Sequence, residues 1–147
     1  MARGERNTIR ITVAALLSGG LSIPFFDYSP DDAMIVFGDL PAGVVDWHLG
    51  RSDRWVHSDQ GSERYSYLLV EVYEPVSEDD HGKASSEEIA AKLEAVEALL
   101  RHNIYLDNTA DGSQIVDSKI EGVAAELEGT GIKARFAWLI LEVKVMK

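Results

Sequence analysis

The 147-residue sequence contains no cysteine, which excludes disulfide bonds, thiolate nucleophiles and zinc sites built on cysteine. It also lacks an apolar run of about 18 residues, the length that indicates a membrane-spanning helix. Basic residues precede an apolar patch within residues 1–20, but Arg10 and Thr12 interrupt that patch and no clean cleavage site follows. We therefore interpret the N-terminus as mature protein and expect a cytoplasmic chain without membrane contact.

Basic residues are scarce, with 14 lysines and arginines against 25 aspartates and glutamates and a net charge of −11. An acidic surface repels nucleic-acid backbones, so sequence-independent DNA binding is not an expected function. A negative net charge keeps a protein soluble and also suits a cell with high internal salt. Composition alone does not decide between these two explanations of the charge. Hydrophobic residues make up 46% of the chain, enough for a packed core. The length predicts a single domain over residues 1–147.

Apolar spacing predicts two helices. The first starts at Asn7 or Thr8, whose side chains can cap it, and ends at Gly19-Gly20, because glycine adopts the left-handed conformation easily. The second starts at Ser85, which fits a capping box with Glu88. The apolar stripe of this second helix consists of Ile89, Leu93, Val96 and Leu100.

The first half of the chain also predicts strands. Two short ones are expected within residues 23–40, separated by turn residues near Pro30, and the apolar run Met34–Phe37 is typical of a buried strand. Residues 41–63 have no sustained period and predict a loop or extended arm, with one strand near residues 44–49 and a turn at residues 59–63. Residues 64–74 form the clearest strand pattern, apolar on both faces, which indicates a central strand or one between a core and a partner.

The last third predicts a turn-rich loop at residues 107–114 and then a β-hairpin around Gly129-Thr130-Gly131. The first arm of the hairpin also fits a helix, but we favour a strand, because the β-rich second arm needs a partner. Together these elements predict an α+β fold. It would be a mainly antiparallel sheet packed against one long helix in the C-terminal half and a short N-terminal helix.

Two segments have ligand chemistry. In "EPVSEDDHGKASSEE", residues 74–88, His81 lies beside consecutive carboxylates, but consecutive loop residues rarely converge on one ion, so we interpret it as a solvated strand-to-helix connection. "DNTADGSQIVDS", residues 107–118, resembles a calcium loop at Asp107, Asp111 and Gly112. Ser118 stands where the bidentate glutamate belongs, so an Asp/Asn/Gly turn is favoured there. We therefore expect no metal ligands.

Other polar and aromatic residues form no recognisable catalytic motif. The histidines are His48, His57, His81 and His102, and surface or interface positions are the favoured reading. Glu71, on an otherwise apolar strand face, is either a tuned carboxylate or, as we favour, paired with a cation or close to the surface. Trp47, Trp55 and Trp138 favour core or protein–protein contacts over base stacking, which needs a basic groove. We expect no catalytic residues and no cofactor.

The order of these elements resembles the tail-completion, or tail-terminator, proteins of long-tailed phages and viruses. The N-terminal helix precedes "IPFFDYSPDDAMIVFGDL", similar to that family's strand, proline turn and second strand. "RYSYLLVEVYEPV" resembles its central strand, "SSEEIAAKLEAVEALL" its capped helix, and "VDSKIEGVAAELEGTGIKARFAWLILEV" its closing hairpin. The sequence departs from the pattern in the acidic insert 78–83 and the tryptophan-containing segment 41–63.

The resemblance implies a structural virion protein without enzymatic activity. Such a subunit forms a homohexameric ring that caps the tail tube and joins it to the head connector. Its partners would be its own copies, the tail tube protein and a head-completion or connector protein. It would be assembled in the host cytoplasm and located in the virion tail or neck. Genome DNA would pass through the ring without specific binding, past a like-charged lining. The alternatives are a head-completion or neck adaptor protein, or a small-ligand-binding or enzymatic α+β domain using Glu71 and a histidine.

Overall fold

The computed structural model describes residues 5–32, 36, 38–48, 52–58, 61–77, 79–102, 112–126 and 133–146. In chain order, the helices and strands are α1 (Glu5–Leu21), β1 (Phe25–Phe26), β2 (Ala42–Trp47), β3 (Arg54–Ser58), β4 (Gly61–Pro75), α3 (Lys83–His102), β5 (Gly112–Glu126) and β6 (Lys133–Met146). None of the described helices has the length and apolar composition needed to span a lipid bilayer.

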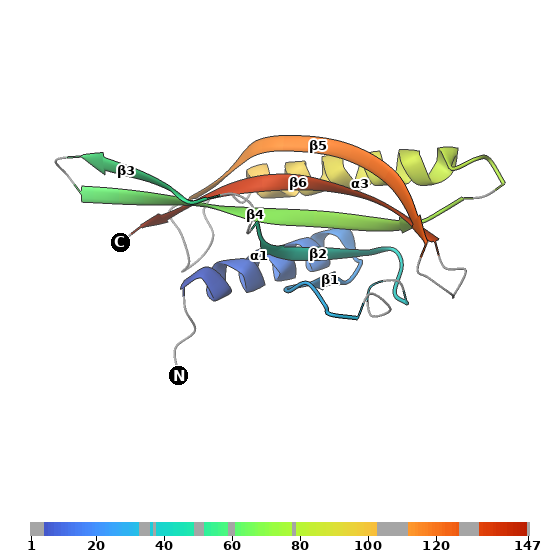
Figure 1. The fold of residues 1–147 in the computed structure, drawn as a ribbon, viewed down its shortest axis with the longest axis horizontal. Coiled ribbons are helices and arrows are strands. Elements are labelled where there is room, and N and C mark those ends of the chain that lie inside the picture. The colour runs from blue at the N-terminus through green and yellow to red at the C-terminus, as the bar shows by residue number, and fades with distance from the viewer. Residues whose placement is uncertain are drawn as a thin grey trace.

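The strands form one sheet in the order β1-β2-β4-β6-β5, with β3 pairing to the first part of β4 (Figure 1). Only the short contact between β1 and β2 is parallel, and the other described pairings are antiparallel. The predicted α+β fold with a mainly antiparallel sheet is therefore confirmed. The N-terminal helix has 17 residues and is longer than expected.

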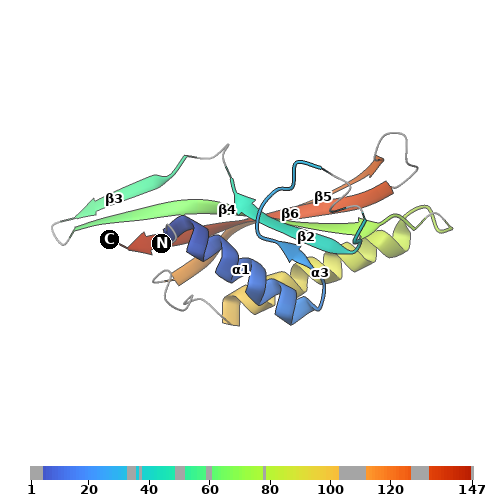
Figure 2. The ribbon, with the colours of Figure 1, turned by 90° about the horizontal axis from the view of Figure 1, so that it is seen from below.

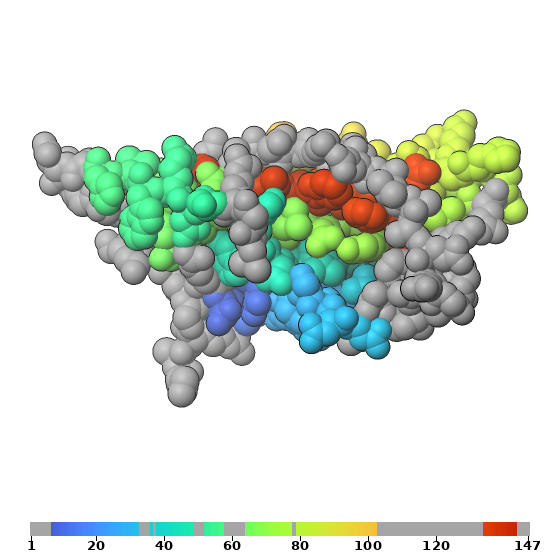
Figure 3. Space-filling view, viewed as in Figure 1, coloured from blue at the N-terminus to red at the C-terminus, as the bar shows by residue number. Residues whose placement is uncertain are grey.

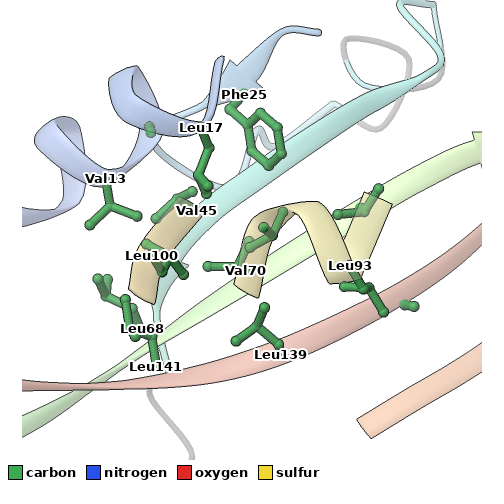
Figure 4. Close-up of a cluster of buried hydrophobic side chains, with 14 of the residues drawn as sticks. Val13, Leu17, Phe25, Val45, Leu68, Val70, Leu93, Leu100, Leu139 and Leu141 are labelled. Atoms are coloured by element: carbon green, nitrogen blue, oxygen red, sulfur yellow. The ribbon is translucent and has the colours of Figure 1, made fainter. Parts of the chain in front are cut away.

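Both helices lie on the same face of the sheet, as Figure 2 shows. The core lies between the helices and this face, where Val13 and Leu17 of α1 and Leu93 and Leu100 of α3 meet strand side chains (Figure 4). The buried strand members are Val45, Leu68, Val70, Val72, Ala137, Leu139, Leu141 and Val143. Each large apolar side chain buried there contributes roughly 1.5–3 kcal/mol, so this layer supplies most of the packing free energy.

Strand β4 occupies the centre because its apolar residues alternate. Leu68, Val70 and Val72 are fully buried on the helix face, and the first two pair with Leu141 and Leu139 of β6. The division of β4 into two faces, predicted from the period of two, is thus confirmed. The strand is longer than predicted, because Gly61–Glu63, expected in a turn, pairs with β3, and Glu63 also pairs with β6.

The start and end predicted for α1 are wrong. Asn7 and Thr8 lie inside the helix, which begins at Glu5, and Gly19 and Gly20 continue it to Leu21. A Cβ atom at Gly20 would overlap the side-chain end of Leu99 on α3. Glycine at this position therefore serves the close approach of the two helices rather than a helix end.

A largely buried ion pair connects α3 to β4. Lys92 Nζ lies 2.8 Å from Glu74 Oε1, and Glu74 is 6% exposed. Burial by itself would lower the pKa of Lys92, but hydrogen bonds to Glu74 and Glu88 outweigh it and raise the pKa above its ordinary value. The charged amine therefore satisfies a carboxylate that burial would otherwise destabilise.

The predictions for residues 23–63 are partly wrong. The first short strand is β1, but Val36, in the predicted strand Met34–Phe37, has helical backbone conformation; the neighbouring residues of that run lie outside the described residues. The strand expected near residues 44–49 is β2, which begins two residues earlier. Strand β3 was missed, because its residues show no apolar alternation with one buried face.

The closing hairpin is confirmed. Strands β5 and β6 pair from Gly112↔Lys144 to Glu126↔Lys133, which decides the ambiguous first arm in favour of a strand. The register shifts between Ile115 and Asp117 and again between Lys119 and Val123, as β-bulges do. The predicted glycine turn lies outside the described residues.

Two glycines provide a test of this packing. A Cβ at Gly43 would overlap the ring of Phe25, whereas a Cβ at Gly19 meets nothing within 4 Å. We expect Gly43→Ala to lower the free energy of unfolding by about 1–3 kcal/mol through overpacking. Gly19→Ala should raise it by about 0.5–1 kcal/mol through helix propensity. Urea denaturation measures both, and equal effects of the two changes would contradict this account of β1 and β2.

Candidate functional site

The face of the sheet opposite the helices carries a second set of apolar side chains. Tyr67, Leu69, Glu71 and Tyr73 of β4 alternate with the core residues, and Phe136, Trp138 and Ile140 do so on β6. Figure 3 looks onto this face and shows atoms of β4 (yellow-green) and β6 (red) side by side, above the segment after β1 (light blue). We call Leu69, Tyr73, Phe136, Trp138 and Ile140 the open face. All five are half-buried.

Three rings of the open face stack in sequence. The ring centroids of Tyr73 and Phe136 are 5.7 Å apart, and those of Phe136 and Trp138 are 5.8 Å apart. The first pair faces across the strands in register, and the second pair follows along β6 at a spacing of two. Such pairs stabilise beyond their buried area by about 0.5–1.5 kcal/mol, so the three rings support one another within the open face.

Glu71 lies within this apolar surface. Tyr73 Oη donates a 2.6 Å hydrogen bond to Glu71 Oε2. We favoured a cation partner or a position close to the surface for Glu71. The structure shows a half-buried side chain with a phenol as hydrogen-bond partner. Burial first, and then the hydrogen bond to Glu71, raise the pKa of Tyr73 above its ordinary value.

One end of the open face is covered by the chain itself. Val36, Ala42 and Val44 form a small buried cluster, against which Phe26 and Tyr73 pack. The ring of Tyr28 contacts Phe26 edge-on but is 45% exposed. The apolar surface thus continues from a buried end at β2 to a half-buried stretch over β4 and β6.

Strand β3 and the first part of β4 form a hairpin that extends beyond the helices (Figures 1 and 2). We call the described residues 52–58 and 61–65 the arm. Arg54 pairs with Glu142 Oε1 at 3.1 Å and lies over the Tyr65 ring at 4.4 Å, on the same side of the sheet as the open face. On the other side of the arm, the Trp55 ring stacks on His57, and the Arg64 guanidinium lies 5.7 Å from the centre of the Trp55 ring.

The arm exposes apolar surface. Trp55 is 48% exposed and Val56 38% exposed, and they lie on opposite sides of β3. Of the predicted tryptophan roles, Trp47 packs against the core, whereas Trp55 and Trp138 lie on the arm and the open face. Sequence reasoning had no signal for the arm except the aromatic content of residues 41–63.

The acidic segment after β4 starts α3. Asp80 accepts hydrogen bonds from the Ser77 hydroxyl at 2.7 Å, the Ala84 N–H at 2.8 Å and the Gly82 N–H at 3.2 Å. The predicted capping box is wrong, because Ser85 is inside the helix and its hydroxyl donates to the Gly82 carbonyl. The Ser77 hydroxyl, followed by the Ala84 N–H, holds the pKa of Asp80 below its usual value.

The remaining sequence candidates lie far from one another. The backbone N–H of His48 donates to the Tyr67 carbonyl, and His57 is on the arm. His81 lies in the loop before α3 with a positive φ of 58°, and His102 is the last residue of α3. Within the residues that the structure describes, no three His, Cys, Asp or Glu side chains gather as metal ligands. Residues 107–111 of the calcium-like segment lie outside the described part, and residues 112–118 are in β5, where the predicted loop does not form.

Against known proteins, no family model matches the chain, and no curated protein matches it.

The Asp80 cap predicts a pH-dependent effect. A carboxyl whose pKa is lowered on folding stabilises the protein above its unfolded pKa of about 4, and this contribution is lost as the pH falls through the folded value. Asp80→Asn should therefore lower Tm by a few degrees at pH 7, with the difference from wild type shrinking below about pH 4. Asp79→Asn is the matched control, and an equal loss from both would contradict the capping role. Differential scanning calorimetry across pH measures this.

The raised pKa of Tyr73 predicts that this phenol ionises at a higher pH than an ordinary tyrosine. A phenol whose pKa is raised on folding stabilises the protein fully below its unfolded pKa of about 10, and this contribution is lost as the pH rises toward the folded value. Absorbance of tyrosinate near 295 nm should show one tyrosine ionising only as the protein unfolds in alkali. Tyr73→Phe should remove that late component and lower the stability at neutral pH, with the difference from wild type shrinking as the pH rises toward the folded value. A late component that persists in Tyr73→Phe would refute the assignment.

Proposed function

We propose that this chain is a structural virion protein. Its copies form a ring that caps the tail tube and joins it to the head connector, and no reaction takes place on it. The observation that carries the proposal is the half-buried aromatic face of a sheet, over which no described helix packs, while the other face is filled by two helices. An extended apolar surface of this kind marks a protein–protein contact more often than a catalytic site.

A closed ring requires two different patches on each subunit, because each copy contacts its neighbours head to tail. The open face and the arm are two such patches with different shapes, one flat and one projecting. Trp138 and Trp55 provide one large aromatic side chain for each, and tryptophan is enriched among residues that dominate interface energies. Two unlike patches favour ring formation over a symmetric dimer.

The ring's copy number and its partners rest on the resemblance to tail-completion proteins. The order helix, short strand, central strand, helix and closing hairpin is the order described above. From that resemblance we take six copies, a tail tube protein on one side and a head-completion or connector protein on the other. The net charge of −11 fits a channel whose lining repels DNA and so lets the genome pass without sticking.

The rival reading, an enzyme or ligand-binding domain using Glu71 and a histidine, has less support. Glu71 is hydrogen-bonded to Tyr73 in the middle of the sheet, and the four histidines lie on the arm, in loops and at a helix end. A general acid–base pair needs hydrogen-bond reach between its members and the substrate. The described geometry brings no histidine to Glu71.

Size-exclusion chromatography with light scattering, native mass spectrometry and negative-stain microscopy test the proposal. The purified chain should form closed rings of one size, and higher salt should strengthen them. This is because the Debye length falls from about 10 Å at 0.1 M to about 3 Å at 1 M, which screens repulsion between the acidic copies. Trp138→Glu should weaken assembly at least tenfold while the circular dichroism stays unchanged.

Ala95→Glu, on the exposed side of α3, is the control with the same added charge. It should still assemble. A wild-type chain that remains monomeric or dimeric at every concentration and salt would contradict the proposed function.

A further inference from the structure

We infer that β3 is a strap that opens from the edge of β4, and that the ion pair between Arg54 and Glu142 is the latch that holds it closed. The inference concerns a movement within one chain and does not depend on the proposed ring. Opening releases residues 54–58 from the sheet and leaves the edge of β4 at residues 61–65 free to pair with another strand.

Two strands share one edge of β4. Strand β6 lies along the opposite edge from residue 63 to residue 75. The remaining edge is covered by β2 at residues 68–73 and by β3 at residues 61–65. The two strands therefore form the same antiparallel ladder with the same partner, and any difference in their stability comes from their side chains.

The side chains anchor β2 but not β3. Ala42, Val44 and Val45 of β2 are buried in the two apolar clusters of the fold. The side chains of residues 54–57 are all exposed, and β3 extends beyond the layer formed by α1 and α3 (Figures 1 and 2). Segments with few buried apolar contacts open at a lower free energy than the core. Strand β3 should therefore separate from β4 much more easily than β2 does.

A single ion pair connects β3 to a strand beyond its partner β4. The Arg54 guanidinium reaches across β4 and donates from Nη2 to Glu142 Oε1 of β6 at 3.1 Å. The same guanidinium lies over the Tyr65 ring at 4.4 Å. The stack of Trp55 on His57 stays within the arm. The pair with Glu142 is thus a contact that β3 loses on leaving the sheet and that the arm cannot replace.

The unequal burial of the two partners makes this pair stronger than a surface ion pair. Glu142 is 7% exposed, whereas the Arg54 side chain is 54% exposed. An ion pair between two exposed side chains contributes little. Removing one partner from a buried carboxylate is far more costly, because the charge stays out of water. Opening of β3 therefore has to overcome the pairing of Glu142, and this pairing sets how often the strap opens.

Hydrogen–deuterium exchange of the full chain tests the strap. In the wild type, amides of residues 55–58 should exchange through local opening, at least about tenfold faster than amides of residues 43–47 on the same edge. Arg54→Met keeps the length of the side chain but removes its charge. It should speed exchange of β3 by about a further tenfold, because a hydrogen bond to a charged group contributes more than a neutral one. Exchange of β2 should not change.

Three further variants separate the latch from a general loss of stability. Arg54→Lys keeps the charge and should retain most of the protection of β3. Arg101→Met removes the ion pair with Glu97 on α3 and should leave β3 unaffected. In a Glu142→Gln background, Arg54→Met should change exchange much less than in the wild type, because the charge pair is already lost. Size-exclusion chromatography checks that all samples share one assembly state.

Equal exchange rates for β2 and β3 in the wild type would overturn the strap. The latch is refuted if Arg54→Met speeds both strands by the same factor, or affects β3 no more than Arg101→Met does. These results leave the proposed ring standing. Conversely, a chain that never assembles contradicts the ring and leaves the strap intact.

Discussion

The antiparallel pairing of β4 with β6 is the constraint on which the structure depends. It runs without a shift from Glu63↔Met146 to Pro75↔Ala134. Side chains alternate between the faces of a sheet, so this one register sends most branched aliphatic residues of both strands to the helices. The aromatic residues, together with Leu69 and Ile140, point to the other face. A slip of one residue would exchange the two sets and bury Glu71 under α3.

The two faces of the sheet use the same alternation for different purposes. The helix face is closed by α1 and α3 and supplies the packing free energy of the fold. The opposite face is built from stacked rings and a tyrosine–glutamate hydrogen bond. It is ordered enough to be specific, yet no described helix covers it. The proposed contact between subunits rests on this face.

The fold class and most elements were predictable because their signals are local. The stripe from Ile89 to Leu100 and the alternation of Leu68, Val70 and Val72 depend on spacing along a single element. The helix ends were not predictable in the same way. Asp80 rather than Ser85 holds the start of α3, and Gly20 serves contact with Leu99 rather than a helix end. At the start of α3, a second side chain nearby competes with Ser85 for the capping role. At Gly20, a residue distant in sequence decides what the glycine does.

Its sequence alone determines that this chain is acidic and cysteine-free and indicates an α+β fold with a two-faced apolar central strand, because composition and periodicity are properties of the chain itself. Tertiary structure decided the rest. Pairing with β4 made residues 54–58 a strand and an arm, although their own pattern has no buried face. It also placed Tyr73, Phe136 and Trp138 in one stack and gave Glu71 a phenol as its partner. These are contacts between segments far apart in the chain, and no local spacing encodes them.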